Sequence, residues 1–222
     1  MKKMITFVSA LLISSTVFSF GLPDIPGVPK LPGVSGSSES SGPSASDAQE
    51  QIVVQFNSVL GHILEAQLHV STALGLDDQV KEVKASQGRL EGNSCKGDCP
   101  KQVKETSDAV QKSIDEKMKE GKVLDEAGKK ELRKAFVPLA KGTYAMTKLG
   151  DAAKNWSKSA KNEIKSAGAM GALKLKKKLS AGLYIVKTTP KIIKNWAGTS
   201  KNIISFGKSQ GVTDEEKVGD EI

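Results

Sequence analysis

Apolar residues recur at helical spacing through most of the chain after residue 46. In the first such segment they fall at steps of three and four, with further leucines and valines beside them. A stripe this wide predicts a helix that packs against at least two neighbours. Its main positions are Ile52, Phe56, Val59, Ile63, Ala66, Val70 and Ala73. Ser46 and Gln49 have the spacing of a capping box at its start, and Gly75 marks its expected end.

The middle of the chain predicts shorter helices separated by turn residues. A helix is expected from Asp77 to about Leu90, followed by a glycine-containing loop. Pro100 can open the next helix, whose narrow apolar stripe and mixed charge are typical of the outside of a bundle. That stripe consists of Val103, Val110, Ile114 and Met118, and the helix ends at Gly121. Another helical pattern starts at Asp125, and Pro138 is expected to kink or break it.

Three basic amphipathic segments follow, with apolar residues on one face and lysines on the other. The second is expected from about Ala169 to Lys187, and Pro190 is expected near the start of the third. The lysines of the polar faces are Lys154, Lys158, Lys161, Lys165, Lys174, Lys177, Lys178, Lys191, Lys194, Lys201 and Lys208. No segment shows convincing strand alternation. The expected fold is therefore all-α, a bundle of about five or six amphipathic helices.

The N-terminal region predicts export. Lys2 and Lys3 precede an apolar run to Phe20, which is the layout of a secretory signal over residues 1–21. Cleavage is expected after Gly21, with Ser19 as the alternative. A membrane anchor is the competing interpretation, but the run does not exceed the roughly 18 residues that a spanning helix needs.

A proline-, glycine- and serine-rich stretch over residues 22–46 is expected to be a disordered linker. Its first part has proline at every third position, Pro23, Pro26, Pro29 and Pro32, which matches one turn of polyproline II. We therefore expect a stiff extended spacer followed by a flexible one. A docking segment for a partner is the alternative.

Charge divides the expected bundle into a near-neutral half, 47–140, and a basic half, 141–212. The basic half contains 15 basic and 2 acidic residues, a net charge of +13, whereas residues 213–222 form an acidic tail of net charge −4. A block this basic favours an anionic partner. The alternative is that the lysines only solubilise a helical surface, although such surfaces usually mix both signs.

The two cysteines, Cys95 and Cys99, are expected to form a disulfide. They flank a polar loop in a chain predicted to be exported, and oxidising compartments pair such cysteines. The bond closes a short loop, so local geometry is its expected role. A redox-active pair would require the Cys-x-x-Cys spacing beside a βαβ unit, and the sequence has neither.

The sequence offers weak candidates for catalysis or metal binding. His62, Glu65 and His69 share one side of the first helix, as metal ligands in a bundle could, but both histidines also suit the border of an apolar stripe. Nucleophile elbows and phosphate-binding glycine loops are missing from the sequence. We expect no enzyme activity, no cofactor and no metal.

These patterns predict an exported, periplasmic or secreted, non-enzymatic protein that binds an anionic lipid or envelope glycolipid surface. The lysines would attract the surface, and Trp156 and Trp196, on the apolar faces, would act as interfacial anchors if the helices open. An assembly protein that docks on an acidic protein partner is the alternative, and a membrane-permeabilising factor is another. Nucleic acid is a poor candidate in the expected compartment.

Overall fold

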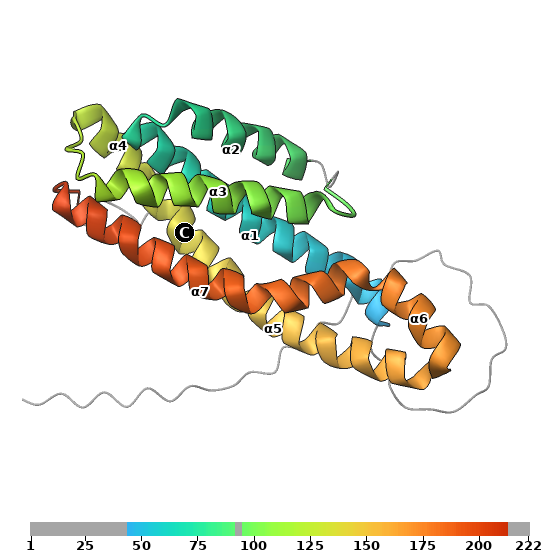
Figure 1. Cartoon of the computed structure of the whole chain (residues 1–222). Coiled ribbons are helices and arrows are strands. Elements are labelled where there is room, and N and C mark those ends of the chain that lie inside the picture. The colour runs from blue at the N-terminus through green and yellow to red at the C-terminus, as the bar shows by residue number, and fades with distance from the viewer. Residues whose placement is uncertain (1–43, 92–94, 213–222) are drawn as a thin grey trace, which may run out of the picture. The chain divides into compact units, whose positions relative to one another are not determined.

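Residues 44–91 and 95–212 are described by a computed structural model and are almost entirely helical (Figure 1). The seven α-helices of these residues are α1 (Ala45–Leu74), α2 (Asp77–Leu90), α3 (Cys99–Lys119), α4 (Glu126–Lys134), α5 (Phe136–Ser166), α6 (Gly168–Lys178) and α7 (Ser180–Ser209). The described part of the chain has no strand, which confirms the predicted all-helical bundle. The expected signal, most of the linker and the acidic tail lie outside the described residues.

Helix α1 is the centre of the bundle because its wide apolar stripe meets several neighbours. It packs against α2, α3, α4, α5 and α7. Every main position of the predicted stripe is buried, and Phe56, Val59 and Leu60 are completely enclosed. Helix α1 ends at Gly75, as predicted. A sequence pattern of alternating three- and four-residue steps therefore located the core helix correctly.

The start of α1 differs from the expected capping box. The N-cap is Ser44, whose hydroxyl accepts a hydrogen bond from the Asp47 amide, so the linker boundary lies earlier than 46. Gln49 does not cap its own helix: its side chain donates to the Lys178 carbonyl at 3.2 Å and accepts from the Gly182 amide at 3.1 Å. The predicted partner of Ser46 thus ties α1 to the α6–α7 junction.

Helices α5 and α7 run antiparallel beside α1 and are joined by α6 (Figure 1). Three glycines allow their close approach. A Cβ on Gly182 would lie 2.4 Å from the Trp156 ring, and one on Gly142 would lie 2.8 Å from the Trp196 ring. A Cβ on Gly207 would likewise lie 2.8 Å from the Phe136 ring. Each aromatic ring therefore occupies the space that a side chain would need.

The two prolines of this region behave differently. The break predicted near Pro138 is present: Ala135 separates α4 from α5, and Pro138 lies in the first turn of α5, where backbone amides need no helical partner. The helix start predicted at Pro190 is wrong, because Pro190 lies inside α7. Ile185 and Ile192 are buried on either side of it. Their packing outweighs the roughly 3 kcal/mol that an internal proline costs a helix.

The segment expected from Ala169 to Lys187 is also divided differently. It breaks at Leu179, which is completely buried and separates α6 from α7. The described residues contain seven helices, one more than the upper end of the predicted number. The apolar stripe continues through Leu179, so its periodicity did not reveal the change of direction.

Candidate functional site

All eleven lysines predicted to bind an anionic surface are exposed. Four lie on α5, three on α6 and four on α7. Four further exposed lysines of the same helices belong to the basic half but were not named among the polar-face residues: Lys141, Lys148, Lys176 and Lys187. The helical register thus turns the whole positive charge of residues 141–212 towards solvent.

Ion pairing separates the two halves of the bundle sharply. Every ion pair between described side chains lies between His62 and Lys134, where charges of both signs alternate along the helices. In contrast, no lysine from 141 to 212 lies within 4.0 Å of a carboxylate of the described residues. The basic half, with a net charge of +13, therefore has no ion-pair partner among the described carboxylates.

The two acidic residues of the basic half do not neutralise its surface. The Glu163 carboxylate accepts a hydrogen bond from the backbone amide of Ala45 at the first residue of α1. Asp151 is exposed on α5 and forms no ion pair with a described side chain. One acid thus serves the fold, and a single one faces solvent among the lysines.

A shallow groove between α5 and α7 brings three of the predicted lysines together. Lys154, Lys158 and Lys161 line its α5 side, whereas Val186 and Ile193 of α7 contribute apolar surface. The volume of the groove is about 440 Å³. Cationic groups beside an apolar floor can accommodate an anionic headgroup together with the start of an acyl chain. Lysines of α6 and the C-terminal part of α7 lie outside this groove.

Both tryptophans predicted as interfacial anchors are core residues in this structure. Each is only 5% exposed. The Trp156 indole donates a hydrogen bond to the Ala45 carbonyl at 2.8 Å, and the Trp196 indole donates to the Thr143 hydroxyl at 3.0 Å. In this conformation the indoles hold helices together, and neither ring is available to a surface.

Helix α6 presents two apolar side chains that the sequence interpretation missed. Met170 is 79% exposed and Leu173 is 69% exposed. No residue of α6 is buried. The apolar stripe expected from about Ala169 to Lys187 is represented in α6 by Leu175, which is partly buried against the core, and Met170 and Leu173 lie outside that stripe. The signal available was the presence of large apolar residues on both faces of so short a helix.

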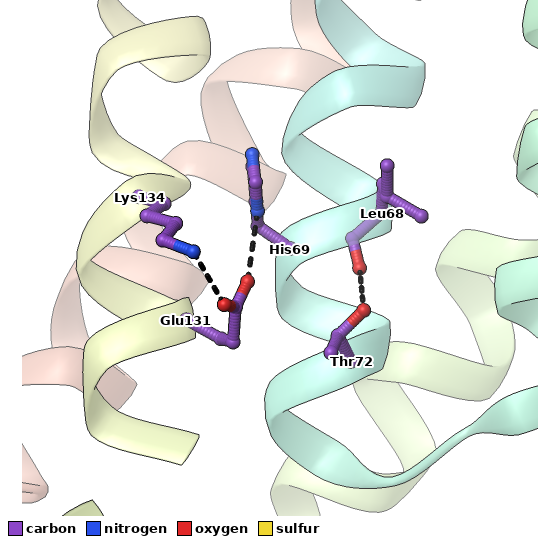
Figure 2. A network of polar contacts seen from close by, with 5 residues as sticks. All are labelled: Leu68, His69, Thr72, Glu131 and Lys134. Atoms are coloured by element: carbon purple, nitrogen blue, oxygen red, sulfur yellow. Dashed lines mark hydrogen bonds and ion pairs between the residues drawn. The ribbon is translucent and has the colours of Figure 1, made fainter. Parts of the chain in front are cut away.

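The histidines of α1 form side-chain contacts within the near-neutral half. Figure 2 shows the His69 ring beside the Glu131 carboxylate, at 3.1 Å, and Lys134 on the other carboxylate oxygen, at 2.6 Å. The Lys134 hydrogen bond, followed by the one from His69, lowers the pKa of Glu131. His62 contacts Glu65 at 3.9 Å. His69 is thus paired with Glu131 across the α1–α4 contact and not with Glu65. The described residues contain no group of three His, Cys, Asp or Glu side chains placed to hold a metal ion.

The predicted disulfide is present. The sulfur atoms of Cys95 and Cys99 are 2.09 Å apart, and the bond joins the loop to the first residue of α3. The Asn57 side chain of α1 donates to the Cys95 carbonyl at 3.3 Å. The bridge therefore fixes a loop that is itself attached to the central helix.

None of the helices in residues 44–91 and 95–212 is long and apolar enough to cross a bilayer. Comparisons with protein-family models, with curated proteins and with solved structures found no match to this chain.

Proposed function

We propose that the protein is an exported, non-enzymatic binding protein that attaches to an anionic membrane or envelope surface through α5, α6 and α7. The observation that carries this proposal is that the lysines of these helices form no ion pair with a described carboxylate. Their lysines are exposed, and no described carboxylate lies near enough to pair with them. A helical surface that only needed to be soluble would mix both signs, as residues 47–140 do.

Free lysines are effective ligands for such a surface. Each contributes about 1 kcal/mol near an anionic leaflet before salt screening. The lysines of the near-neutral half contribute less because several already lie beside carboxylates, as Lys81 does with Asp78 and Lys134 with Glu131. The contact area is therefore assigned to the C-terminal helices and not to the whole protein.

Burial of the indoles limits the way in which the protein binds. Trp156 and Trp196 act as anchors only if the bundle opens, which would break their hydrogen bonds to Ala45 and Thr143. We therefore assign the contact to the lysines of the closed bundle. The α5–α7 groove, with Lys154, Lys158 and Lys161, is the proposed place for individual anionic headgroups.

Export rests on the signal-like residues 1–21, which lie outside the described residues, and is supported by the Cys95–Cys99 disulfide. Disulfides form and persist mainly in oxidising compartments. Phospholipid and glycolipid headgroups are the abundant anions there, and this favours them over nucleic acid as the partner.

The test is co-sedimentation of the protein with vesicles of phosphatidylcholine alone and of phosphatidylcholine mixed with phosphatidylglycerol, at low and high salt. Selective binding to the anionic vesicles that weakens with salt is the expected result. An absence of binding, combined with salt-sensitive capture of an acidic protein, would replace this function with docking on a protein partner. Dye release at stoichiometric binding would instead indicate a permeabilising factor.

A further inference from the structure

Helix α6 differs from the other described helices in having no buried residue. It packs against α5 and α7 only through partly buried residues. Met170 and Leu173 lie one turn apart and face solvent together. Neighbouring exposed apolar side chains form a contiguous patch, and such patches are a feature of interaction surfaces.

The same face becomes basic towards the end of α6. Lys174 and Lys177 follow Met170 by four and seven residues, so helical geometry places them on the same side. Both are exposed, and neither pairs with a described carboxylate. The outer face of α6 is thus apolar in its first turns and cationic in its last. In a bilayer interface, acyl chains can accept the apolar residues and phosphates can accept the lysines.

The junctions at both ends fix the direction of this face. Gly168 adopts a φ of +64°, a left-handed conformation that turns the chain sharply after α5. At the other end, buried Leu179 and the two hydrogen bonds of Gln49 hold the α6–α7 junction against α1. The exposed face is therefore held by the bundle and does not depend on free movement of α6.

We propose that α6 is the part of the protein that enters the membrane, with Met170 and Leu173 inserted among the acyl chains of an anionic bilayer. This inference rests on the proposed function and assigns its partner to lipid. Charge argues against a second copy of the chain as the occupant, because two such faces would bring their unpaired lysines together. Insertion of two side chains is shallow and leaves the bundle intact.

The experiment uses a tryptophan at position 173, introduced as Leu173→Trp, and vesicles whose acyl chains carry bromine. Quenching of the new indole by anionic vesicles is expected, whereas the buried native indoles of Trp156 and Trp196 remain largely unquenched. The double variant Met170→Ser/Leu173→Ser should bind about tenfold more weakly, since each buried apolar side chain stabilises binding. The matched control Val123→Ser, at a residue that is 81% exposed outside the basic half, should bind normally.

Failure of this inference can be distinguished from failure of the proposed function. Anionic vesicles that bind the protein without quenching at position 173, and equally well after Met170→Ser/Leu173→Ser, would overturn insertion and leave surface binding in place. No binding by the unmodified protein would overturn both. A dimer in sedimentation that the double variant dissociates would assign the face to a second copy and also overturn insertion.

Discussion

Gly182 of α7 lies against the indole of Trp156 in α5, so closely that a Cβ at position 182 would be 2.4 Å from two ring atoms. The same indole reaches the Ala45 carbonyl of α1 through its nitrogen. The contact between Gly182 and the indole therefore fixes the spacing between α5 and α7. The hydrogen bond of the indole also attaches the start of α1 to α5. The pair connects three helices near the junction from which α6 extends.

The substitution Gly182→Ala is expected to destabilise the fold by up to about 2 kcal/mol. The added methyl group forces the Trp156 ring to move, and overpacking costs about 1–3 kcal/mol, which the better helix propensity of alanine offsets by about 1. Gly198→Ala in the same helix is the matched control, because nothing lies within 4 Å of its Cβ position. It should stabilise by about 0.5–1 kcal/mol in urea unfolding. Equal effects of the two variants would contradict the assigned packing.

Trp156→Phe is expected to lower the free energy of unfolding by about 1–3 kcal/mol, through loss of the hydrogen bond to Ala45 and of buried volume. Hydrogen exchange should also rise selectively in the first turn of α1. Trp196→Phe makes the same chemical change and loses the bond to Thr143 instead. That control should reduce stability without a selective effect at Ala45. A uniform rise in exchange for both variants would contradict the role given to Trp156.

The lowered pKa of Glu131 predicts that the free energy of unfolding depends on pH. The hydrogen bonds from Lys134 and His69 hold the pKa of this carboxyl below its ordinary value, so ionised Glu131 favours the folded state. This stabilisation is present above the unfolded pKa of about 4.3 and is lost as pH falls through the lower folded pKa. The difference in unfolding free energy between the protein and Glu131→Gln should therefore shrink on acidification. Glu126→Gln, at a side chain that is 90% exposed, should have little effect at any pH.

Removal of the disulfide by Cys95→Ser/Cys99→Ser should cost less than the roughly 3 kcal/mol expected for a 15-residue loop, because these cysteines are separated by only 4 positions. Chemical unfolding of the oxidised protein and the double variant measures this difference. Loss of the folded state in the variant would show that the bridge does more than fix the loop beside Asn57.

The periodicity of apolar residues predicted a helix well where one continuous apolar stripe of that helix is buried in the bundle. The α1 stripe, the end at Gly75 and α2 from Asp77 to Leu90 are as expected. Contacts between distant residues were not accessible in this way. Gln49 was assigned to a local cap, yet its partners are 129 and 133 residues away. Burial on both sides of Pro190 likewise kept α7 continuous despite a residue that normally ends a helix.

The candidate site was predicted in part. Exposure of the lysines follows from their position opposite an apolar stripe, but whether carboxylates of other described helices lie near them depends on tertiary packing. An apolar face alone does not specify whether protein or membrane covers it, so Trp156 and Trp196 were expected to anchor at an interface only if the helices open. Met170 and Leu173 were missed because the predicted apolar stripe follows the inward side of α6, and these two residues lie on the outer side.

Binding is expected to depend on the unpaired lysines of the C-terminal helices and not on net charge. The most direct test compares two fourfold variants of equal charge in a binding titration with anionic vesicles. One replaces by glutamine the α5 lysines Lys154, Lys158, Lys161 and Lys165, and the other replaces Lys81, Lys112, Lys117 and Lys129, which pair with carboxylates. The first should weaken binding at least about tenfold, since each free lysine contributes about 1 kcal/mol before screening, and the second should change it little. Equal losses from both variants, or no loss from the first, would contradict a contact made by the unpaired lysines.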